Sequence, residues 1–370
     1  MICLGNIAIS FNTGAVAAAI PTISQDLGLP DFWVAKIIPS YMIPYGLGAL
    51  LYAPLTRFAA YRTISMIAMA LYAVFSLMTG LSHSLSSMLL AQVGAGVAAA
   101  SSTPLSLMII GDFFDKEVRG RLVGTYFGCS FIASLAGMIF MGVVDWRWLF
   151  FIPAVLGAAT VICYLVLRPS LLDHGHQASI NYFQILSSWR VQKVFIFIFI
   201  MSFLYHGVHK WYGVYLNREY GLDKFSISWF LVVVALCGLM GQQIGGFLSD
   251  KKGRLFACHM GMAMLSLATM ALLGHYPIIL LAVIISLIVM GWTIGHNSVS
   301  TILTDFPDDD RPLVASLNSA VRFISGGLGF TASKFFVEKS FNLTFFVIGA
   351  MMLAMIVLLK QIFVEHSTGG

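Results

Sequence analysis

Five basic or potentially basic side chains lie inside long apolar stretches of the sequence: His206, His209, Lys210, His296 and Arg322. An ionisable group within an apolar span is costly and usually faces a cavity, so each is a candidate functional residue. The planar, permanently charged guanidinium of Arg322 suits bidentate binding of a carboxylate or phosphate. Histidine changes charge near neutral pH, so the imidazoles could also carry protons. These residue types predict binding of a small anion.

Acidic side chains are placed differently. The chain has 16 Asp and Glu residues, and by our assignment each lies in a loop or at a membrane interface. The apolar stretches therefore hold no paired carboxylates, no nucleophile beside a base and no cluster of metal-binding side chains. We expect no enzymatic activity, no cofactor and no bound metal.

The composition indicates what surrounds these residues. Of 370 residues, 59% are hydrophobic and 10% are charged. A soluble domain carries about 25% charged residues, so the surface of this chain must face lipid. A spanning helix needs about 20 mainly apolar residues, which predicts an all-α membrane protein with twelve transmembrane helices. They are expected near residues 3–21, 33–55, 63–82, 86–111, 121–143, 148–167, 194–216, 226–249, 255–274, 277–303, 313–336 and 341–363.

The predicted helices fall into two groups of six. The longest polar break runs from Arg168 to Arg190. It predicts an N-terminal bundle at 1–168, a cytoplasmic central loop at 169–192 and a C-terminal bundle at 193–370.

Two pairs of segments repeat at the same offset. GDFFDKEVRGRLVG, from Gly111, resembles TDFPDDDRPLVA, from Thr304, and APLTRFAAYR, from Ala53, matches GFLSDKKGR, from Gly246, in position. Internal repeats are the building principle of many membrane folds whose binding sites lie near the midplane. The sequence therefore predicts two pseudo-symmetric bundles.

The basic residues predict the orientation. Loops assigned to the cytoplasmic side carry about twice as many Lys and Arg residues as the opposite loops, and such an excess marks the cytoplasmic side. We expect a multi-pass protein of the inner (cytoplasmic) membrane with both termini cytoplasmic. It should be monomeric and have no nucleic-acid partner, and its partners should be the lipid bilayer, a small-molecule substrate and, if transport is coupled, protons.

One loop carries a family resemblance. Gly246-Phe-Leu-Ser-Asp250-Lys-Lys-Gly253-Arg254 resembles the signature loop G-x-L-a-D-r-x-G-r of the major facilitator superfamily, between its helices 8 and 9. The resemblance implies two six-helix bundles that alternate access by rocking. It also implies a conformational latch in which Gly246 and Gly253 allow close packing and a tight turn, while Asp250 and Arg254 supply charges.

The N-terminal half is similar to the drug:proton antiporter branch of that superfamily. The similar segments are AIPTISQDLGL, from Ala19, and DWRWLFF, from Asp145. The coupling positions of that branch differ in this chain, however. Asn12 occupies the position of the branch's acidic residue in helix 1, and Gln92 occupies the position of its arginine in helix 4. Arg57 occupies the position of the signature aspartate in the first half. We therefore do not carry proton antiport over to this chain.

Helix periodicity relates the basic residues to one another. His206 and Lys210 share one helix face, and Arg322 lies about 15 Å from the cytoplasmic start of its helix, close to the midplane. In the resembling fold, helices 7, 10 and 11 line the central cavity. The predicted substrate-binding residues are Arg322, Lys210, His206, His209, His296, Asn12, Gln92, Tyr126 and Asn318.

Packing roles remain open for these residues. Lys210 could extend to the outer interface. Arg322 could hydrogen bond to amides such as that of Asn318, and the histidines, Asn12 and Gln92 could fill packing positions. Tyr41, Tyr45 and Tyr126 could likewise be packing residues.

The leading function is secondary active or facilitative transport of a small solute, expected to be an organic anion. One alternative is efflux of hydrophobic or cationic compounds, which the N-terminal resemblance favours and a basic cavity disfavours. An alternative of another class is a transporter-shaped receptor or assembly factor that moves no solute. The sequence leaves the substrate, the direction of transport and the coupling ion open.

Overall fold

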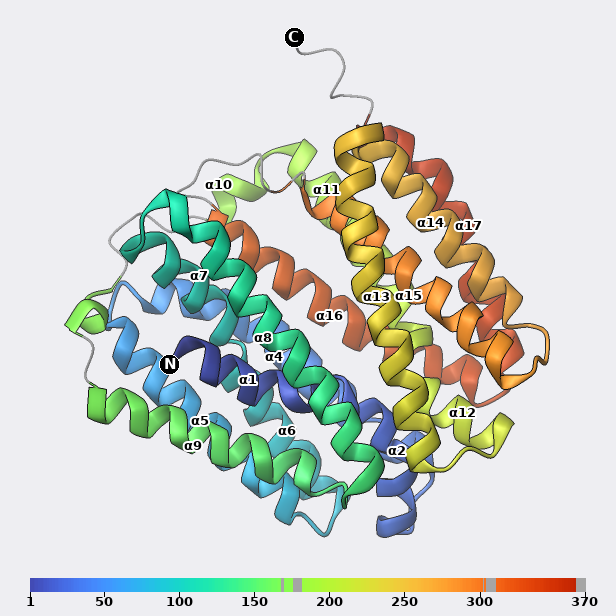
Figure 1. The fold of residues 1–370 in the computed structure, drawn as a ribbon, viewed down its shortest axis with the longest axis horizontal. Helices are drawn as coiled ribbons and strands as arrows, with labels where there is room; N and C mark the ends of the chain where they lie inside the picture. Colours follow the sequence, from blue (N-terminus) through green and yellow to red (C-terminus); the bar gives the residue numbers. More distant parts are fainter. Residues whose placement is uncertain (168–169, 176–181, 302, 304–310, 364–370) are drawn as a thin grey trace. The chain divides into compact units, whose positions relative to one another are not determined.

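The computed structural model describes residues 1–167, 170–175, 182–301, 303 and 311–363, and every regular element in these ranges is a helix (Figure 1). The elements are α1 (Ile2–Thr13), α2 (Ala15–Leu27), α3 (Asp31–Val34), α4 (Ile37–Leu55), α5 (Tyr61–Leu81), α6 (Leu85–Ala99), α7 (Ser102–Phe113), α8 (Lys116–Val143), α9 (Trp148–Leu167), η1 (Ser170–Asp173), α10 (Tyr182–Leu186), α11 (Trp189–His209), α12 (Tyr212–Tyr220), α13 (Lys224–Lys252), α14 (Arg254–Ala271), α15 (Ile278–Ser300), α16 (Arg311–Val337) and α17 (Phe341–Phe363).

The predicted all-α membrane fold is confirmed. Ten helical segments are long and apolar enough to cross a membrane. α1 and α2 meet the same criterion together but bend by 49°, and α17 supplies a shorter apolar helix over Phe341–Val357. In the described part of the chain, these twelve segments match the twelve predicted spans one for one.

Local sequence sets where two long helices begin and end. Asp223 precedes α13, and its carboxylate accepts a hydrogen bond of 3.0 Å from the backbone N–H of Ser226, as an N-cap residue does. Hydrogen bonds from Ser226 lower the pKa of Asp223 from its ordinary value. At the other end of α13, Gly253 has a φ of +88°, which allows the tight turn into α14.

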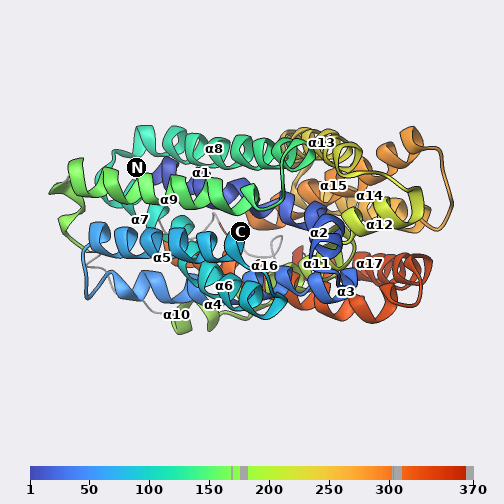
Figure 2. The ribbon, with the colours of Figure 1, turned by 90° about the horizontal axis from the view of Figure 1, so that it is seen from below.

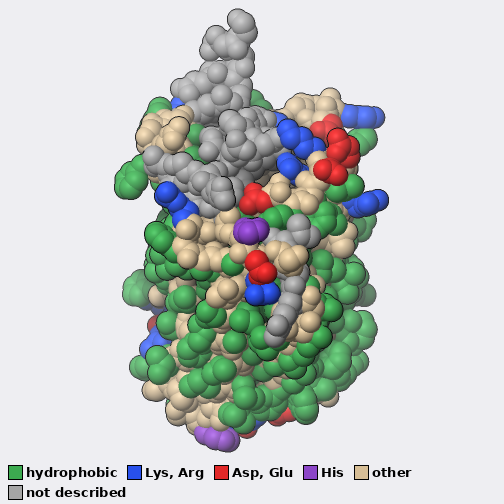
Figure 3. Space-filling view, turned by 90° about the vertical axis from the view of Figure 1, so that its left-hand side faces the viewer, with side chains coloured by type: hydrophobic (Ala, Val, Ile, Leu, Met, Phe, Trp, Pro, Cys, Tyr) green, Lys and Arg blue, Asp and Glu red, His purple; other side chains and the backbone are tan. Residues whose placement is uncertain are grey.

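Large apolar side chains cover the outside of the helices. Leu90, Val155 and Ile279 are 69%, 67% and 78% exposed. Figure 3 shows one face on which hydrophobic side chains predominate, while charged side chains gather towards its upper end. Such a surface would be unstable in water and suits contact with lipid.

The helices form two compact units. Unit 1 comprises Met1–Tyr182, Trp211–Trp229 and Pro312–Leu328, and unit 2 comprises Phe183–Lys210, Phe230–Arg311 and Gly329–Gly370. Unit 1 thus contains two segments of the predicted C-terminal half, because these units follow packing and not the order of the chain. The predicted boundaries at 168 and 193 follow the polar break between Arg168 and Arg190 and stay a prediction.

Within unit 1, α5 packs beside α9, and α1 packs against α8 and α9 (Figures 1 and 2). The described part of the predicted central loop is tied to the start of α5. There Arg62 forms an ion pair of 3.0 Å with Asp173, and the N–H of Tyr61 donates to the carbonyl of His174. Residues 176–181 of this loop, and the repeat segment at 304–310, lie outside the described residues.

Candidate substrate-binding site

Arg322 lies where α16 packs closely against α4. A Cβ at Gly46 of α4 would come within 2.8 Å of the carbonyl oxygen of Ala320, so only glycine permits this approach. The Tyr45 ring stacks on Phe323 at a centroid distance of 3.9 Å. Arg322 interacts electrostatically with the hydroxyl of Tyr45. The guanidinium therefore has a tyrosine from the other half of the chain as a neighbour.

Further hydroxyl groups surround this tyrosine. Thr103 of α7 lies beside the hydroxyls of both Tyr45 and Tyr126 of α8. The Tyr126 hydroxyl also shares a hydrogen bond of 2.7 Å with Ser102, and its side chain is fully buried. Four elements, α4, α7, α8 and α16, thus gather one guanidinium and several hydroxyls, which we call the Arg322 cluster.

Asn318 adds an acceptor one turn from Arg322 on α16. Its Oδ1 is buried and accepts no hydrogen bond from the described residues. A buried amide oxygen without a donor is costly, and a hydroxyl group of a bound solute would satisfy it.

The structure thus places three of the predicted residues, Arg322, Tyr126 and Asn318, in or next to the Arg322 cluster of unit 1. Sequence reasoning considered Tyr45 mainly for packing and missed Ser102 and Thr103. Hydroxyls of this kind give no sequence signal, because Ser and Thr inside helices commonly bond to their own backbone.

Asn12 and Gln92 make other contacts. The amide of Gln92 donates to Thr79 Oγ1 at 3.1 Å, which joins α6 to α5. Asn12 is buried and interacts with the hydroxyl of Tyr72 on α5. Of the two roles left open by the sequence, these contacts favour packing for both residues.

The predicted histidines come together in unit 2. Tyr205 of α11 stacks on Trp292 of α15 at 4.2 Å, and His209 stacks on Tyr205 at 4.9 Å. His296 stacks on Trp292 at 5.0 Å, and His206 meets Trp292 edge to face at 5.5 Å. These five rings form the histidine cluster. Sequence reasoning missed Trp292, which connects α11 to α15.

Lys210 follows the last residue of α11 and is 9% exposed. A lysine that extended to the interface would leave its ammonium group in water. Its burial favours a place inside the protein over that alternative.

The signature loop agrees with its predicted roles only in part. Gly253 makes the tight turn between α13 and α14. The close packing expected at Gly246 is not found, because a Cβ there would meet no atom within 4 Å. Asp250 is exposed near the end of α13, and Arg254 begins α14. The latch itself stays a prediction.

Segments from the two predicted halves also meet where α12 and the preceding Trp211 lie against α2 and α3, on the side predicted to face outward. Arg218 forms an ion pair of 2.7 Å with Asp31 and lies 4.5 Å from the ring centre of Phe32. Phe32 in turn contacts Trp211 at 5.7 Å. At Gly213 of α12, a Cβ would lie 2.5 Å from the carbonyl oxygen of Ala17. We call this the outer contact.

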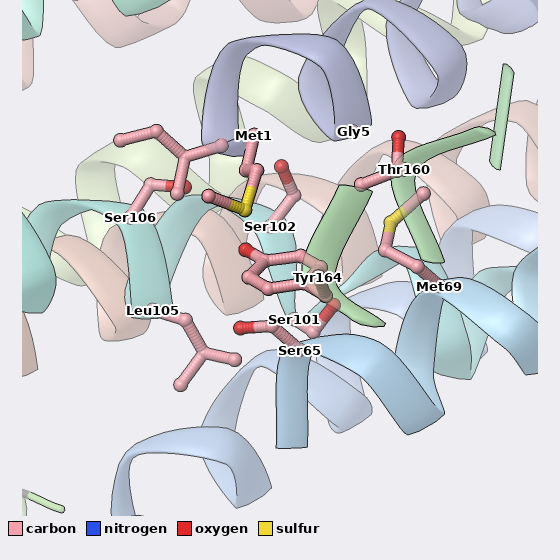
Figure 4. A pocket seen from close by; sticks show the side chains of 11 residues that line it. Met1, Gly5, Ser65, Met69, Ser101, Ser102, Leu105, Ser106, Thr160 and Tyr164 are labelled. Atoms are coloured by element: carbon pink, nitrogen blue, oxygen red, sulfur yellow. The ribbon is translucent and has the colours of Figure 1, made fainter. Parts of the chain in front are cut away.

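A small polar pocket lies inside the N-terminal helices of unit 1. Figure 4 shows side chains converging on it from α5, α7 and α9, among them Ser65, Ser102, Thr160 and Tyr164. Its volume of about 20 Å³ has room for a water molecule but not for an organic solute. Ser102 links this pocket to Tyr126 of the Arg322 cluster.

The family model described as the Major Facilitator Superfamily matches residues 2–330 and 214–368. The chain belongs to the Major Facilitator Superfamily. The expectation drawn from the signature loop is therefore confirmed at the level of the family.

Several relatives of this superfamily are named as transporters. The chain is 25% identical to the Probable L-galactonate transporter of Escherichia coli (strain K12), over 64% of this chain and 57% of that protein. It is also 25% identical to Multidrug resistance protein 3 of Bacillus subtilis (strain 168), over 47% of this chain and 35% of that protein. The alignments thus span less than two thirds of either relative.

Solved structures of superfamily members share the fold. A bacterial homologue of the human lysosomal transporter Spinster, in an inward-facing and unoccupied conformation, superposes with a TM-score of 0.78 at 15% identity, covering 98% of this chain and 96% of that one. A D-xylose–proton symporter gives a TM-score of 0.73 at 14% identity, with the same coverage. At these identities the likeness concerns the fold alone.

Proposed function

We propose that this protein is a membrane transporter that moves a small organic anion by alternating access. The observation that carries the proposal is the Arg322 cluster, in which a permanent positive charge adjoins Tyr45 on helices from both halves of the chain. A guanidinium binds a carboxylate through two parallel hydrogen bonds, and these are strong where water is scarce.

The neighbours of Arg322 narrow the substrate class. Thr103, Tyr126 and Ser102 offer hydroxyls, and Asn318 offers an acceptor that lacks a donor. This set suits an anion that itself carries hydroxyl groups, such as a sugar acid. L-galactonate, which gives its name to the relative in Escherichia coli, is such a molecule.

The outer contact supports alternating access. Gly213 and Arg218 lie in the C-terminal half of the chain, whereas Ala17 and Asp31 lie in the N-terminal half. A solute can enter from outside only if these segments separate, and an ion pair in contact with water separates at modest cost.

The basic residues of unit 2 have a supporting role. Lys210 places positive charge within the membrane span, which raises the local concentration of anions, and His209 of the histidine cluster lies beside it. The signature loop, with Asp250, Gly253 and Arg254, would favour one conformation over the other. Placement in the inner membrane with cytoplasmic termini, and a monomeric state, are parts of the same proposal.

Efflux of hydrophobic or cationic compounds is the second candidate function. It is favoured by relatives whose names describe drug resistance or efflux, such as Multidrug resistance protein 3. Positive charge at Arg322 disfavours a cationic substrate. A receptor that binds a ligand without moving it is the third candidate.

The test combines ligand binding with uptake by proteoliposomes. Purified protein would be titrated with L-galactonate, other sugar acids, phosphate esters, amines and lipophilic cations, and each bound compound would be used in uptake assays. Arg322→Ala should weaken anion binding about 10- to 150-fold, since hydrogen bonds to a charged group contribute about 1.5–3 kcal/mol. The anion affinity of Arg322→Lys should lie between those of wild type and Arg322→Ala, because lysine keeps the charge but cannot donate two parallel hydrogen bonds.

Lys334→Ala is the matched control, because it removes a positive charge from the same helix where Lys334 is paired with Glu338. Its anion affinity should equal that of the wild type. Equal uptake by wild type and Arg322→Ala would refute the proposed site. Binding of cations or lipophilic drugs, unaffected by Arg322→Ala, would favour efflux, and binding without uptake would favour a receptor.

A further inference from the structure

Two cysteines from distant parts of the sequence meet where α1 packs against α8 (Figure 1). Cys3 lies in the first turn of α1 and Cys129 near the middle of α8, and their thiols are close enough to interact. Both thiols are free and both side chains are half-buried. The other three cysteines lie on α9, α13 and α14. The pair therefore places two oxidisable sulfur atoms beside each other in unit 1.

The close packing of α1 on α8 explains why these cysteines meet. The carbonyl oxygen of Phe11 faces Gly137, where a Cβ would overlap it, and the Phe11 ring contacts that of Phe140 at 5.7 Å. Phe11 and Gly137 each follow the cysteine of their own helix by the same number of residues, about two turns. Residues about two turns apart share a helix face, so Cys3 and Cys129 belong to the faces in contact.

A polar contact one turn along α1 holds the same region. The side-chain amide of Asn6 donates to the carbonyl oxygen of Tyr126 at 2.8 Å and also bonds to Ser130 Oγ. Asn6 follows Cys3 by one turn, and Ser130 is the next residue after Cys129. These bonds oppose sliding of α1 along α8. A disulfide requires closely spaced Cα atoms, and this contact keeps the two helices together at that point.

The predicted orientation sets the redox conditions. We expect the N-terminus, and with it the first turn of α1, on the cytoplasmic side. Thiols there stay reduced, and the disulfides that do form usually act in catalysis or in sensing of oxidants. Hydrogen peroxide is a suitable oxidant because it is small and uncharged, and half-buried thiols are accessible to such a molecule.

We propose that Cys3 and Cys129 form a redox site at which hydrogen peroxide converts the two thiols into a disulfide between α1 and α8. One thiolate attacks a peroxide oxygen, the O–O bond breaks, and the sulfur becomes a sulfenic acid as one water leaves. The second thiolate attacks that sulfur, the S–O bond breaks, and an S–S bond forms as a second water leaves. The two sulfur atoms lose two electrons, peroxide gains them, and the two thiol protons end in the two waters.

The neighbouring thiol decides which product forms. A sulfenic acid without a thiol partner can be oxidised further to a sulfinic acid, which a thiol reductant does not reverse. A second thiol within reach reacts first, because an intramolecular step has a high effective concentration. A dithiol reductant then restores both thiols by exchange. The reaction does not depend on the solute that the protein transports, so the inference stands apart from the proposed function.

The test uses the full chain in proteoliposomes with only this pair of cysteines kept. Cys163 and Cys237 are replaced by serine, and the buried Cys258 by alanine. After treatment with hydrogen peroxide and then catalase, the protein is unfolded in a maleimide and its intact mass is measured. The chain should lose two hydrogen atoms and carry no maleimide, and dithiothreitol should restore two labelled thiols. Its Tm should rise on oxidation and fall on reduction, because a cross-link restricts the unfolded chain.

The matched control keeps Cys129 and Cys163, which are likewise two half-buried thiols of unit 1, and has Cys3 replaced by serine. It should form an internal disulfide at least about tenfold more slowly, because its thiols lack the neighbouring partner. Wild type with all five cysteines is tested separately, by searching its proteolytic digest for a peptide in which Cys3 is linked to Cys129. This measurement does not depend on whether the variants fold.

Three results would overturn the inference. The first is sulfinic acid on Cys3 or Cys129 of folded protein without a cross-link. The second is an internal disulfide that forms as fast in the control as in the test variant. The third is a wild-type digest, prepared after peroxide treatment, that contains both cysteines only in unlinked peptides.

Discussion

Two glycine-lined helix contacts, one in each unit, differ in the segments that they join. In unit 1, α12 meets α2 at Gly213, and these helices belong to different halves of the chain. In unit 2, consecutive helices α14 and α15 meet at Gly261 and Gly291. Both contacts bring backbone against backbone, yet they have different surroundings.

The outer contact in unit 1 ends in a water-accessible ion pair, because the side chain of Arg218 is 37% exposed and that of Asp31 is 14% exposed. The α14–α15 contact is flanked by the fully buried side chains of Leu265 and Ile288. Charges in water separate at little cost, whereas separating a dry apolar contact exposes surface at about 25 cal/mol per Å². Under the proposed alternating access, we therefore expect the outer contact to open and the α14–α15 contact to hold its half together.

The largest effect on stability is expected at the α14–α15 contact. A Cβ at Gly291 would lie 2.6 Å from the backbone nitrogen of Leu265 and 2.7 Å from the carbonyl oxygen of Gly261. Backbone atoms cannot rotate away, so Gly291→Leu should destabilise unit 2 by about 3 kcal/mol or more and lower the yield of folded protein. The check is thermal unfolding of purified protein, with Gly246→Leu as the control because space is open at Gly246. An unchanged Tm in Gly291→Leu would contradict the comparison.

The next effect is expected at the outer contact. Gly213→Leu should fold, because α12 can move away from α2 as it would during transport, but it should prevent closure at Ala17 and Ala18. Transport should fall about 5- to 150-fold, since overpacking of 1–3 kcal/mol shifts a two-state equilibrium by that factor. The check is labelling of Ala18→Cys by a membrane-impermeant maleimide, with the five native cysteines replaced by serine. Labelling should rise with Gly213→Leu, and a drop in Tm like that of Gly291→Leu would show that the two contacts do not differ.

The smallest effect is expected at the ion pair. Asp31→Asn or Arg218→Gln should remove about 0.2–1 kcal/mol from the closed form and raise labelling of Ala18→Cys up to about fivefold at low salt. Exchanging the charges, with Asp31→Arg and Arg218→Asp together, should restore much of the stability of the closed form and lower the labelling again.

Asp26→Asn is the control for that measurement. Asp26 pairs with Arg147 at 2.8 Å, and both residues belong to the N-terminal half, so this bond need not break during transport. If Asp26→Asn raised labelling as much as Asp31→Asn, the ion pair between the halves would have no special role.

The sequence by itself predicted the helices, the family and the placement of charge. A span is recognisable because its length and apolarity are local properties that the bilayer thickness fixes. Arg322 and Asn318 could be placed together because residues four apart share a helix face. The tight turn at Gly253 was also foreseen, because glycine alone adopts its backbone angle without strain.

Only the tertiary structure decided which polar groups meet. Gln92 and Tyr126 were both candidates in sequence, yet Gln92 bonds to Thr79 while Tyr126 joins Ser102 within the Arg322 cluster. Likewise, no periodicity relates His206 to His296, and Trp292 brings them into one cluster. The physical reason is the sequence separation of the interacting residues. The length of a span and the face of a helix follow from residues close together in the chain, whereas the partner of a buried polar group depends on how helices distant in sequence pack.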